Sequence, residues 1–212
     1  MNTLRKHWYD LGALLSIAVS VCIYINFPHL TNYRILMWLS LVALFLHQWE
    51  EYRVPGTFPG MINTVMYHSQ MPDRYPLNTN TAFYINVCVG WTFYFFAAFF
   101  AERAIWLGIA TMMVSVGNIT AHTIIFNLRG KTFYNAGLVT ALLLFMPSVY
   151  FFVSIIYADH LAGKADYWIG IPLGIILNVA GVLKTIHLMA DKNSPYIFND
   201  RNLLPKDRKK KQ

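Results

Sequence analysis

Charged residues and cysteines are scarce in this chain, and both shortages narrow the class of protein. Only 13% of the 212 residues are charged and 56% are hydrophobic, whereas soluble domains carry roughly 25% charged residues. This balance excludes an ordinary soluble domain and is typical of a membrane protein. The two cysteines, Cys22 and Cys88, both lie in apolar runs. The sequence therefore predicts neither a disulfide framework nor a cysteine-rich metal site.

The formal charge of +7 is distributed unevenly along the chain. Much of it lies in the last twelve residues, RNLLPKDRKKKQ. We interpret residues 191–212 as a basic cytoplasmic tail near anionic lipid, and not as an arm that binds nucleic acid. The lipid bilayer is thus the expected partner, and the sequence leaves the oligomeric state open.

Apolar runs long enough to cross a membrane dominate the rest of the sequence. A spanning helix needs about 20 residues, with a range of about 17–25. The first run follows Arg5 and Lys6 but ends in CIYINFPHL, which contains no small-residue cleavage site, so we interpret it as a retained helix. The sequence predicts an all-α polytopic membrane protein, with residues 1–190 as one bundle of six transmembrane helices at 11–27, 33–49, 81–101, 104–126, 137–157 and 167–189.

The orientation of these helices follows from the basic residues in their short connections, because lysine and arginine are enriched on the cytoplasmic side. If the N-terminus is cytoplasmic, that side also receives the basic tail and Arg5, Lys6, Arg53, Arg74, Arg129 and Lys131. The opposite side receives fewer basic residues, accompanied by acidic ones: Arg34, Arg103, Lys164, Glu102, Asp159 and Asp166. We therefore predict that both termini are cytoplasmic.

Ionisable side chains occur where the second and fourth runs approach the cytoplasm. His47, Glu50 and Glu51 end the second run, and their spacings of three and four residues place them on one helical face. Asn118 and His122 share a face of the fourth run for the same reason. Ionisable groups inside a membrane usually face the bundle interior, because exposure to lipid costs several kcal/mol. The two helices are therefore predicted to share a polar pocket.

Neighbouring helices add polar groups at a similar depth. Asn86 lies near the start of the third run, and Lys184 and His187 lie in the last turns of the sixth. The alternative interpretation is structural: the glutamates are solvated at the membrane boundary or paired with Arg53 or Lys184, and His187 is an interfacial residue.

Histidine and carboxylate without cysteine suit a divalent metal, with zinc favoured over iron or manganese. The glutamate that is not a ligand would act as the catalytic base on metal-bound water. Asn86 and Asn118 would orient ligands or stabilise a developing oxyanion. The sequence thus predicts a metal-dependent hydrolase whose ligands come from His47, His122, His187 and Glu50 or Glu51.

Three short segments resemble the H-x-x-E-E domain family of small bacterial membrane proteins, over residues of about 35–150. HQWEEY at 47–52 matches the defining motif, and NITAH at 118–122 supplies a second histidine, His122. YNAGLVTALLLFMP at 134–147 places Tyr134 and Gly137 in a Tyr-x-Pro-Gly motif, with Ala136 where proline is expected. The resemblance implies a fold and a site, and a bacterial inner membrane as the location, but no reaction. Alanine loses the φ restriction of proline and leaves the site residues in place.

Other activities fit the same residues. A metal-free site resembles that of the intramembrane CAAX-type proteases, although Arg53 stands too near the glutamate pair for their signature. An iron-dependent oxygenase is a further possibility, but the chain contains no box of closely spaced histidines. A proton- or cation-coupled carrier could use the buried cluster as well, yet no inverted repeat is visible.

The connection at residues 52–80 bears on the substrate. It contains two Pro-Gly turns and then MINTVMYHSQM, in which Met61, Val65 and Tyr67 or His68 could form an interfacial helix. Connections of this length often act as lids or binding loops. A methionine-rich lid over a cytoplasmic-side cavity favours an apolar or lipid-like substrate, and the alternative is a plain amphipathic connector.

Overall fold

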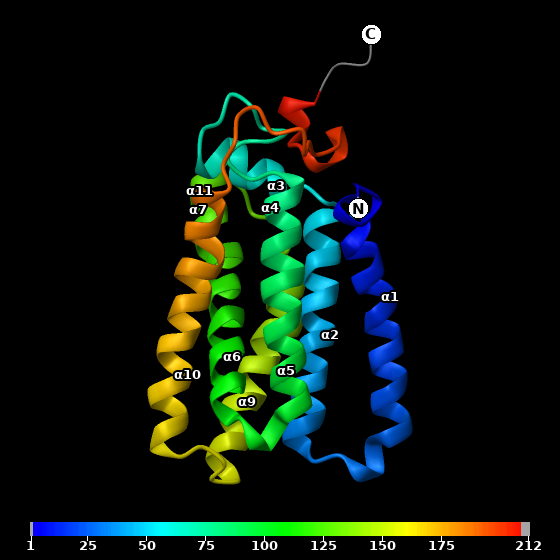
Figure 1. Ribbon diagram of the computed structural model, residues 1–212, viewed down its shortest axis with the longest axis vertical. Coiled ribbons are helices and arrows are strands. Elements are labelled where there is room, and N and C mark those ends of the chain that lie inside the picture. The colour runs from blue at the N-terminus through cyan, green and yellow to red at the C-terminus, as the bar shows by residue number, and fades with distance from the viewer. Residues whose placement is uncertain (1, 209–212) are drawn as a thin grey trace.

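The computed structural model describes residues 2–208, in which the chain forms a bundle of helical rods that run side by side, with no strand (Figure 1). The first two rods are single helices, α1 (Asn2–Asn26) and α2 (Asn32–Tyr52). Each of the other four combines α-helical and π-helical turns, so the described chain confirms the all-α prediction. They are α4 (Thr79–Phe83) with η3 (Tyr84–Trp91) and α5 (Thr92–Phe100); α6 (Ile105–Thr120) with η5 (Ala121–Ile125) and α7 (Phe126–Gly130); α8 (Leu138–Thr140) with η6 (Ala141–Phe145) and α9 (Met146–Ala158); and α10 (Lys164–Ile176) with η7 (Leu177–Lys184) and α11 (Thr185–Leu188).

Within residues 2–208, five helices are long and apolar enough to cross a membrane, and they indicate a membrane protein. They are Thr3–His29, Thr79–Arg103, Ile105–Gly130, Leu138–Ala158 and Lys164–Leu188. The other expected span, 33–49, corresponds to α2, which is 21 residues long but is not among these five. Most of α2 is buried by the other rods, so it can carry Gln48, Glu50 and Glu51 without exposing them to lipid.

An apolar cluster fills the end of the bundle that lies farthest from His47, Glu51 and His122. It brings together the start of α2 and of α6 with the ends of α5 and α9, and includes Met37, Ala98, Ile105 and Phe152. Small residues such as Ala98, which is fully buried, let these rods approach closely. The buried histidines and glutamates, which we call the polar cluster (His47, Glu50, Glu51 and His122), therefore lie toward the other end of the bundle and not along its whole length.

Short helices and loops cover the end of the bundle that carries the polar cluster (Figure 1). The connection after α2 contains α3 (Phe58–Gly60) and the π-helical η2 (Met61–Met66), which is packed into the protein with Met61 and Ile62 buried. Two short 3₁₀ helices, η8 (Asp200–Asn202) and η9 (Pro205–Asp207), lie on the same end. Further 3₁₀ turns, η1 (Phe27–His29) and η4 (Ala101–Arg103), lie at connections between rods.

The C-terminal segment, which the sequence predicts as a basic tail, packs in part against the rest of the protein. Phe198 and Leu203 are buried, and Asn202 Nδ2 donates hydrogen bonds of 2.9 Å to the carbonyl oxygens of Tyr52 and Gly56. A Cβ at Gly60 would lie 2.6 Å from the backbone nitrogen of Leu204, so the two segments pack backbone to backbone. These contacts hold the segment over the connection that follows α2. The last residues of the predicted basic tail, Lys209, Lys210, Lys211 and Gln212, lie outside the described part of the chain.

Candidate metal centre

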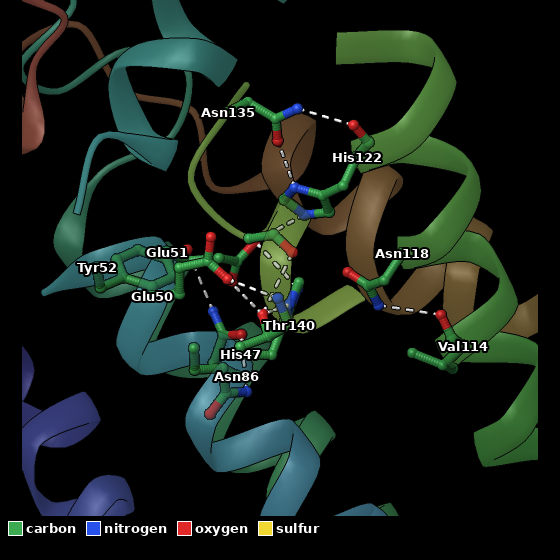
Figure 2. Close-up of polar contacts among 12 residues, drawn as sticks. His47, Glu50, Glu51, Tyr52, Asn86, Val114, Asn118, His122, Asn135 and Thr140 are labelled. Carbon is green, nitrogen blue, oxygen red and sulfur yellow. Dashed lines mark hydrogen bonds and ion pairs between the residues drawn. The ribbon is translucent and has the colours of Figure 1, made fainter. Parts of the chain in front are cut away.

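Two histidines and one glutamate converge inside the bundle. His47 and Glu51 come from the last turns of α2, and His122 comes from η5. One ligand atom from each lies within 4.8 Å of the others, and all three side chains are buried. Glu51 Oε1 is 3.2 Å from His122 Nε2 and 3.6 Å from His47 Nε2. Figure 2 shows the three side chains pointing toward one another.

The hydrogen bonds of His47 determine which nitrogen faces this point of convergence. Its Nδ1 lies 2.8 Å from Thr140 Oγ1, and that hydroxyl donates its own proton to Glu50 Oε2 at 2.6 Å. Thr140 Oγ1 must therefore accept from His47, which places the ring proton on Nδ1. The Nε2 atom of His47 then carries a lone pair and points toward Glu51.

His122 is held in the same tautomer by Asn135. The carboxamide of Asn135 donates from Nδ2 to the His122 carbonyl and to Asn127 Oδ1, both at 2.8 Å, which fixes its orientation. Its Oδ1 therefore accepts from His122 Nδ1 at 2.6 Å (Figure 2). The lone pair of His122 Nε2 faces Glu51, as that of His47 does.

Gly137 lets the chain pass directly against the His122 ring. It has a φ of +105°, a conformation that other residues rarely adopt, and it immediately precedes α8. A Cβ at this position would overlap His122 Cε1 and lie 2.6 Å from Nδ1. Two independent constraints therefore favour glycine at position 137: its backbone conformation, and the lack of space for a Cβ beside the His122 imidazole.

Glu50 is bonded to the start of the next rod and takes no part in the convergence. Its Oε1 accepts from Tyr134 Oη at 3.0 Å and from the Val139 amide at 3.3 Å. Its Oε2 accepts from both the amide and the hydroxyl of Thr140, at 2.9 and 2.6 Å. The amides at a helix start lack partners within the helix, and the positive end of its dipole favours an anion. Glu50 thus stabilises the start of α8 and, through Thr140, orients His47.

Tyr134 lies between two spans, where burial and the neighbouring Glu50 carboxylate raise the pKa of its phenol to about 12. The phenol therefore keeps its proton at neutral pH and donates it to Glu50. Both residues of the third motif thus serve the centre: Tyr134 binds Glu50, and Gly137 gives room to His122.

A cavity of about 100 Å³ adjoins the convergence point on the side of η3 and η7. Asn86 and Asn118 line it together with His47 and Glu51. Asn118 Nδ2 donates to the Val114 carbonyl (Figure 2), so this residue is anchored within its own helix. The sequence-predicted asparagines therefore lie beside the centre and not among its ligand atoms.

Other predicted site residues lie apart from the centre. His187 is exposed, and its Nε2 lies 3.2 Å from Tyr67 Oη, because the buried side of its turn is taken by Ile186. Lys184 is exposed as well. Arg53 pairs with Asp10 of α1 at 3.2 Å and not with a motif glutamate. The metal group in the described chain thus contains two of the three predicted histidines and one of the two glutamates.

The centre has the chemistry of a cation site. The Nε2 atoms of His47 and His122 are fully buried and form no hydrogen bond with any described residue. Both present lone pairs, and Glu51 adds a carboxylate oxygen beside them. Buried polar atoms are normally satisfied, and histidine ligands usually donate their second ring nitrogen to an oxygen, as both do here. The three residues fit a divalent metal with further positions open.

Thr140 and Asn135 are the residues of the centre that sequence reasoning missed. Asn135 lies inside the YNAG segment, so its place in the motif is a signal that could have identified it. Thr140 gives no such signal, because a threonine near a helix start is ordinary.

Comparison with known proteins agrees with the motif. The family model described as a protein of unknown function with HXXEE motif matches residues 38–152, which is more than half of the chain. No curated protein and no solved structure matches. The matched segment contains both histidines, both glutamates and the YNAG turn of the centre. The chain belongs to the HXXEE family.

Proposed function

We propose that this protein is a membrane-embedded, metal-dependent hydrolase. The observation that carries the proposal is the convergence of two histidine lone pairs and the Glu51 carboxylate, in which neither Nε2 atom has a hydrogen-bond partner among the described residues. Three such groups repel one another unless a proton or a metal cation lies between them, and a divalent ion can satisfy all three at once. Two histidines and one carboxylate with open positions are a common ligand set of catalytic zinc.

A divalent ion held by His47, Glu51 and His122 would lower the pKa of a bound water toward 7. Glu50 is an unsuitable base, because protein donors occupy both of its oxygens. We therefore assign the roles of metal ligand and catalytic base to Glu51. Its Oε1 faces the histidines and would bind the metal. The second oxygen of the same carboxylate would accept the proton of the attacking water. Asn118, which lines the adjoining cavity, orients the water or the substrate carbonyl.

The membrane setting belongs to the same proposal. We place both termini of a six-span bundle on the cytoplasmic side of a bacterial inner membrane, because the basic residues gather at that end. The centre then lies near the cytoplasmic face, beneath the cover formed by α3, η2 and the C-terminal segment. Phe58 of α3 stacks over His122 at 5.8 Å between ring centroids, so an apolar group closes the cytoplasmic side. An apolar or lipid-like substrate suits this enclosure.

An iron-dependent oxygenase is the second candidate, and the ligand set itself favours it. Two histidines and one carboxylate also form the facial triad of non-haem iron enzymes. A proton or cation carrier has less support. The apolar cluster around Met37, Ala98 and Phe152 fills the opposite end of the bundle, and a conduit would have to cross it.

The origin of the oxygen in the product distinguishes these activities. Metal-stripped protein in liposomes of total bacterial lipid is reloaded with zinc, manganese or iron and incubated in ¹⁸O-water, or in ordinary water under ¹⁸O₂. If the protein is a hydrolase, the zinc-loaded wild type should release a product that carries oxygen from the labelled water. The His122→Ala variant should release no labelled product. Label from O₂ with iron would establish the oxygenase instead, and no labelled product with any metal would refute both.

A further inference from the structure

The cavity beside the metal centre has a polar wall that carries no basic group. Besides His47 and Glu51, the lining residues with polar side-chain groups are Gln48, Tyr52, Asn86, Tyr94 and Asn118, and none of the residues that line the cavity is lysine or arginine. A phosphate or free carboxylate on a substrate is normally met by such cations. The wall thus suits an uncharged polar group.

The neutral groups of this wall are held in place by one another. Trp91 Nε1 donates to Gln48 Oε1 at 2.7 Å, and Gln48 Nε2 donates to Asn86 Oδ1 at 3.0 Å. Asn86 Nδ2 then donates to Tyr52 Oη at 3.3 Å. Because the Tyr52 oxygen accepts this bond, its own proton remains available to a carbonyl or leaving-group oxygen in the cavity.

The rest of the cavity is apolar and small. Its walls include Leu44, Ile85, Val114, Leu177 and Val182, which come from α2, η3, α6 and η7. An apolar protein cavity of about 150 Å³ holds a benzene molecule, so a cavity of about 100 Å³ has room for about four carbons. Glu51 and His47 line the same cavity, so these carbons would lie close to the reacting group.

We propose that the substrate is an uncharged acyl compound, a carboxylic ester or amide, whose first carbons occupy this cavity. The proposal rests on the proposed hydrolase function and specifies its substrate class. The water oxygen bonds to the acyl carbon, and the bond from that carbon to the ester oxygen or amide nitrogen breaks. One water proton passes to Glu51 and then to the leaving group, so the products are a carboxylic acid and an alcohol or amine.

Gly90 offers a way to alter the cavity without touching the metal ligands. It lines the cavity, and a Cβ there would meet Gln48 Nε2 at 3.6 Å and Leu44 Cδ2 at 3.7 Å, which are ordinary contact distances. Gly90→Val therefore fills part of the space, and Gly90→Ala fills less. Gly181→Val is the matched control, because its Cβ would also lie at ordinary distances, 3.5 Å from Val89 Cγ1, but Gly181 does not line the cavity.

The test is calorimetric binding of acetyl-, butyryl-, hexanoyl- and octanoyl-hydroxamic acid to the zinc-loaded protein in nanodiscs. Burial of each methylene should raise affinity about fourfold until about four carbons are placed, after which the gain should stop. Gly90→Val should weaken butyryl-hydroxamic acid by roughly tenfold and leave the acetyl compound unchanged. Gly90→Ala should weaken butyryl-hydroxamic acid by less than Gly90→Val does, and it should also leave the acetyl compound unchanged. Gly181→Val should change neither affinity.

The inference that the substrate group in the cavity is uncharged is tested with alkylphosphonic acids of matched chain length, which are charged. The ratio of hydroxamate affinity to phosphonate affinity is measured for the protein and for zinc in water. The ratio for the protein should be about tenfold higher. Equal or tighter phosphonate binding, or affinities that do not depend on chain length, would overturn the inference while zinc content stays intact. Absence of zinc from the reloaded wild-type protein would instead refute the proposed function, and this inference with it.

Discussion

The two adjacent glutamates of the motif have different roles, so replacing each by glutamine should affect different properties of the protein. Glu50 accepts four hydrogen bonds, from Tyr134, Val139 and twice from Thr140. A glutamine keeps one acceptor oxygen and replaces the other by an amino group, which faces donors. At least two bonds to a charged acceptor are then lost, at about 1.5–3 kcal/mol each, so Glu50→Gln should reduce the free energy of unfolding by about 3–6 kcal/mol.

Glu51 has no comparable set of donors, because its near neighbours in the described chain are the two histidine Nε2 atoms. Glu51→Gln therefore removes a buried carboxylate without stranding a donor. Its effect on the stability of the metal-free protein should be within about 1 kcal/mol. Metal binding, by contrast, should be lost, because one of the three ligands is gone.

Both variants are compared with wild type in chelator, which removes any contribution of bound metal to stability. Glu50→Gln should lower the Tm by on the order of 10 °C, and Glu51→Gln should leave it nearly unchanged. The metal content of each variant is measured separately by mass spectrometry after reloading. Equal Tm values for the two variants, or full metal content in Glu51→Gln, would refute the division of roles.

Further predictions follow from the groups that surround the ligands. Thr140→Val removes the hydroxyl that orients His47, and Asn135→Ala removes the acceptor for His122 Nδ1; each should weaken zinc binding about 10- to 100-fold in a chelator competition, and unchanged affinity would contradict the tautomer assignment. Gly137→Ala should abolish metal binding, because its Cβ overlaps the His122 ring; stoichiometric metal in this variant would show that the ring can move aside. The pKa of the Tyr134 phenol is about 12 in the folded protein and about 10 when unfolded, so its stabilising effect should be complete below pH 10 and decline as the pH rises toward 12. Subtracting the Tm-against-pH curve of Tyr134→Phe should isolate that decline, and parallel curves would exclude it.

The helices could be predicted from the sequence because lipid demands long, continuous apolar segments. The last rod, for example, was expected at 167–189 and includes the span Lys164–Leu188. The packing of the C-terminal segment could not be predicted in this way. Phe198 and Leu203 are isolated apolar residues with no helical period, so only the fold reveals that they are buried.

The site was predictable to the level of which helices contribute. The motif placed His47, the glutamates and His122 in one layer, and the ligand group contains one residue of the glutamate pair. The choice between Glu50 and Glu51 could not be made, because adjacent residues differ by about 100° around a helix and the neighbouring rods decide which direction meets a donor. His187 shares the depth of the centre but faces outward, a distinction that depth alone does not make.

The metal content of the purified protein is the most direct test of the metal centre. We expect near-stoichiometric zinc, iron or manganese by elemental mass spectrometry in the wild-type protein. We expect no metal in a His47→Ala, His122→Ala double variant prepared in the same way. Wild-type protein that remains metal-free after reconstitution with each of these ions would rule out the centre formed by His47, Glu51 and His122.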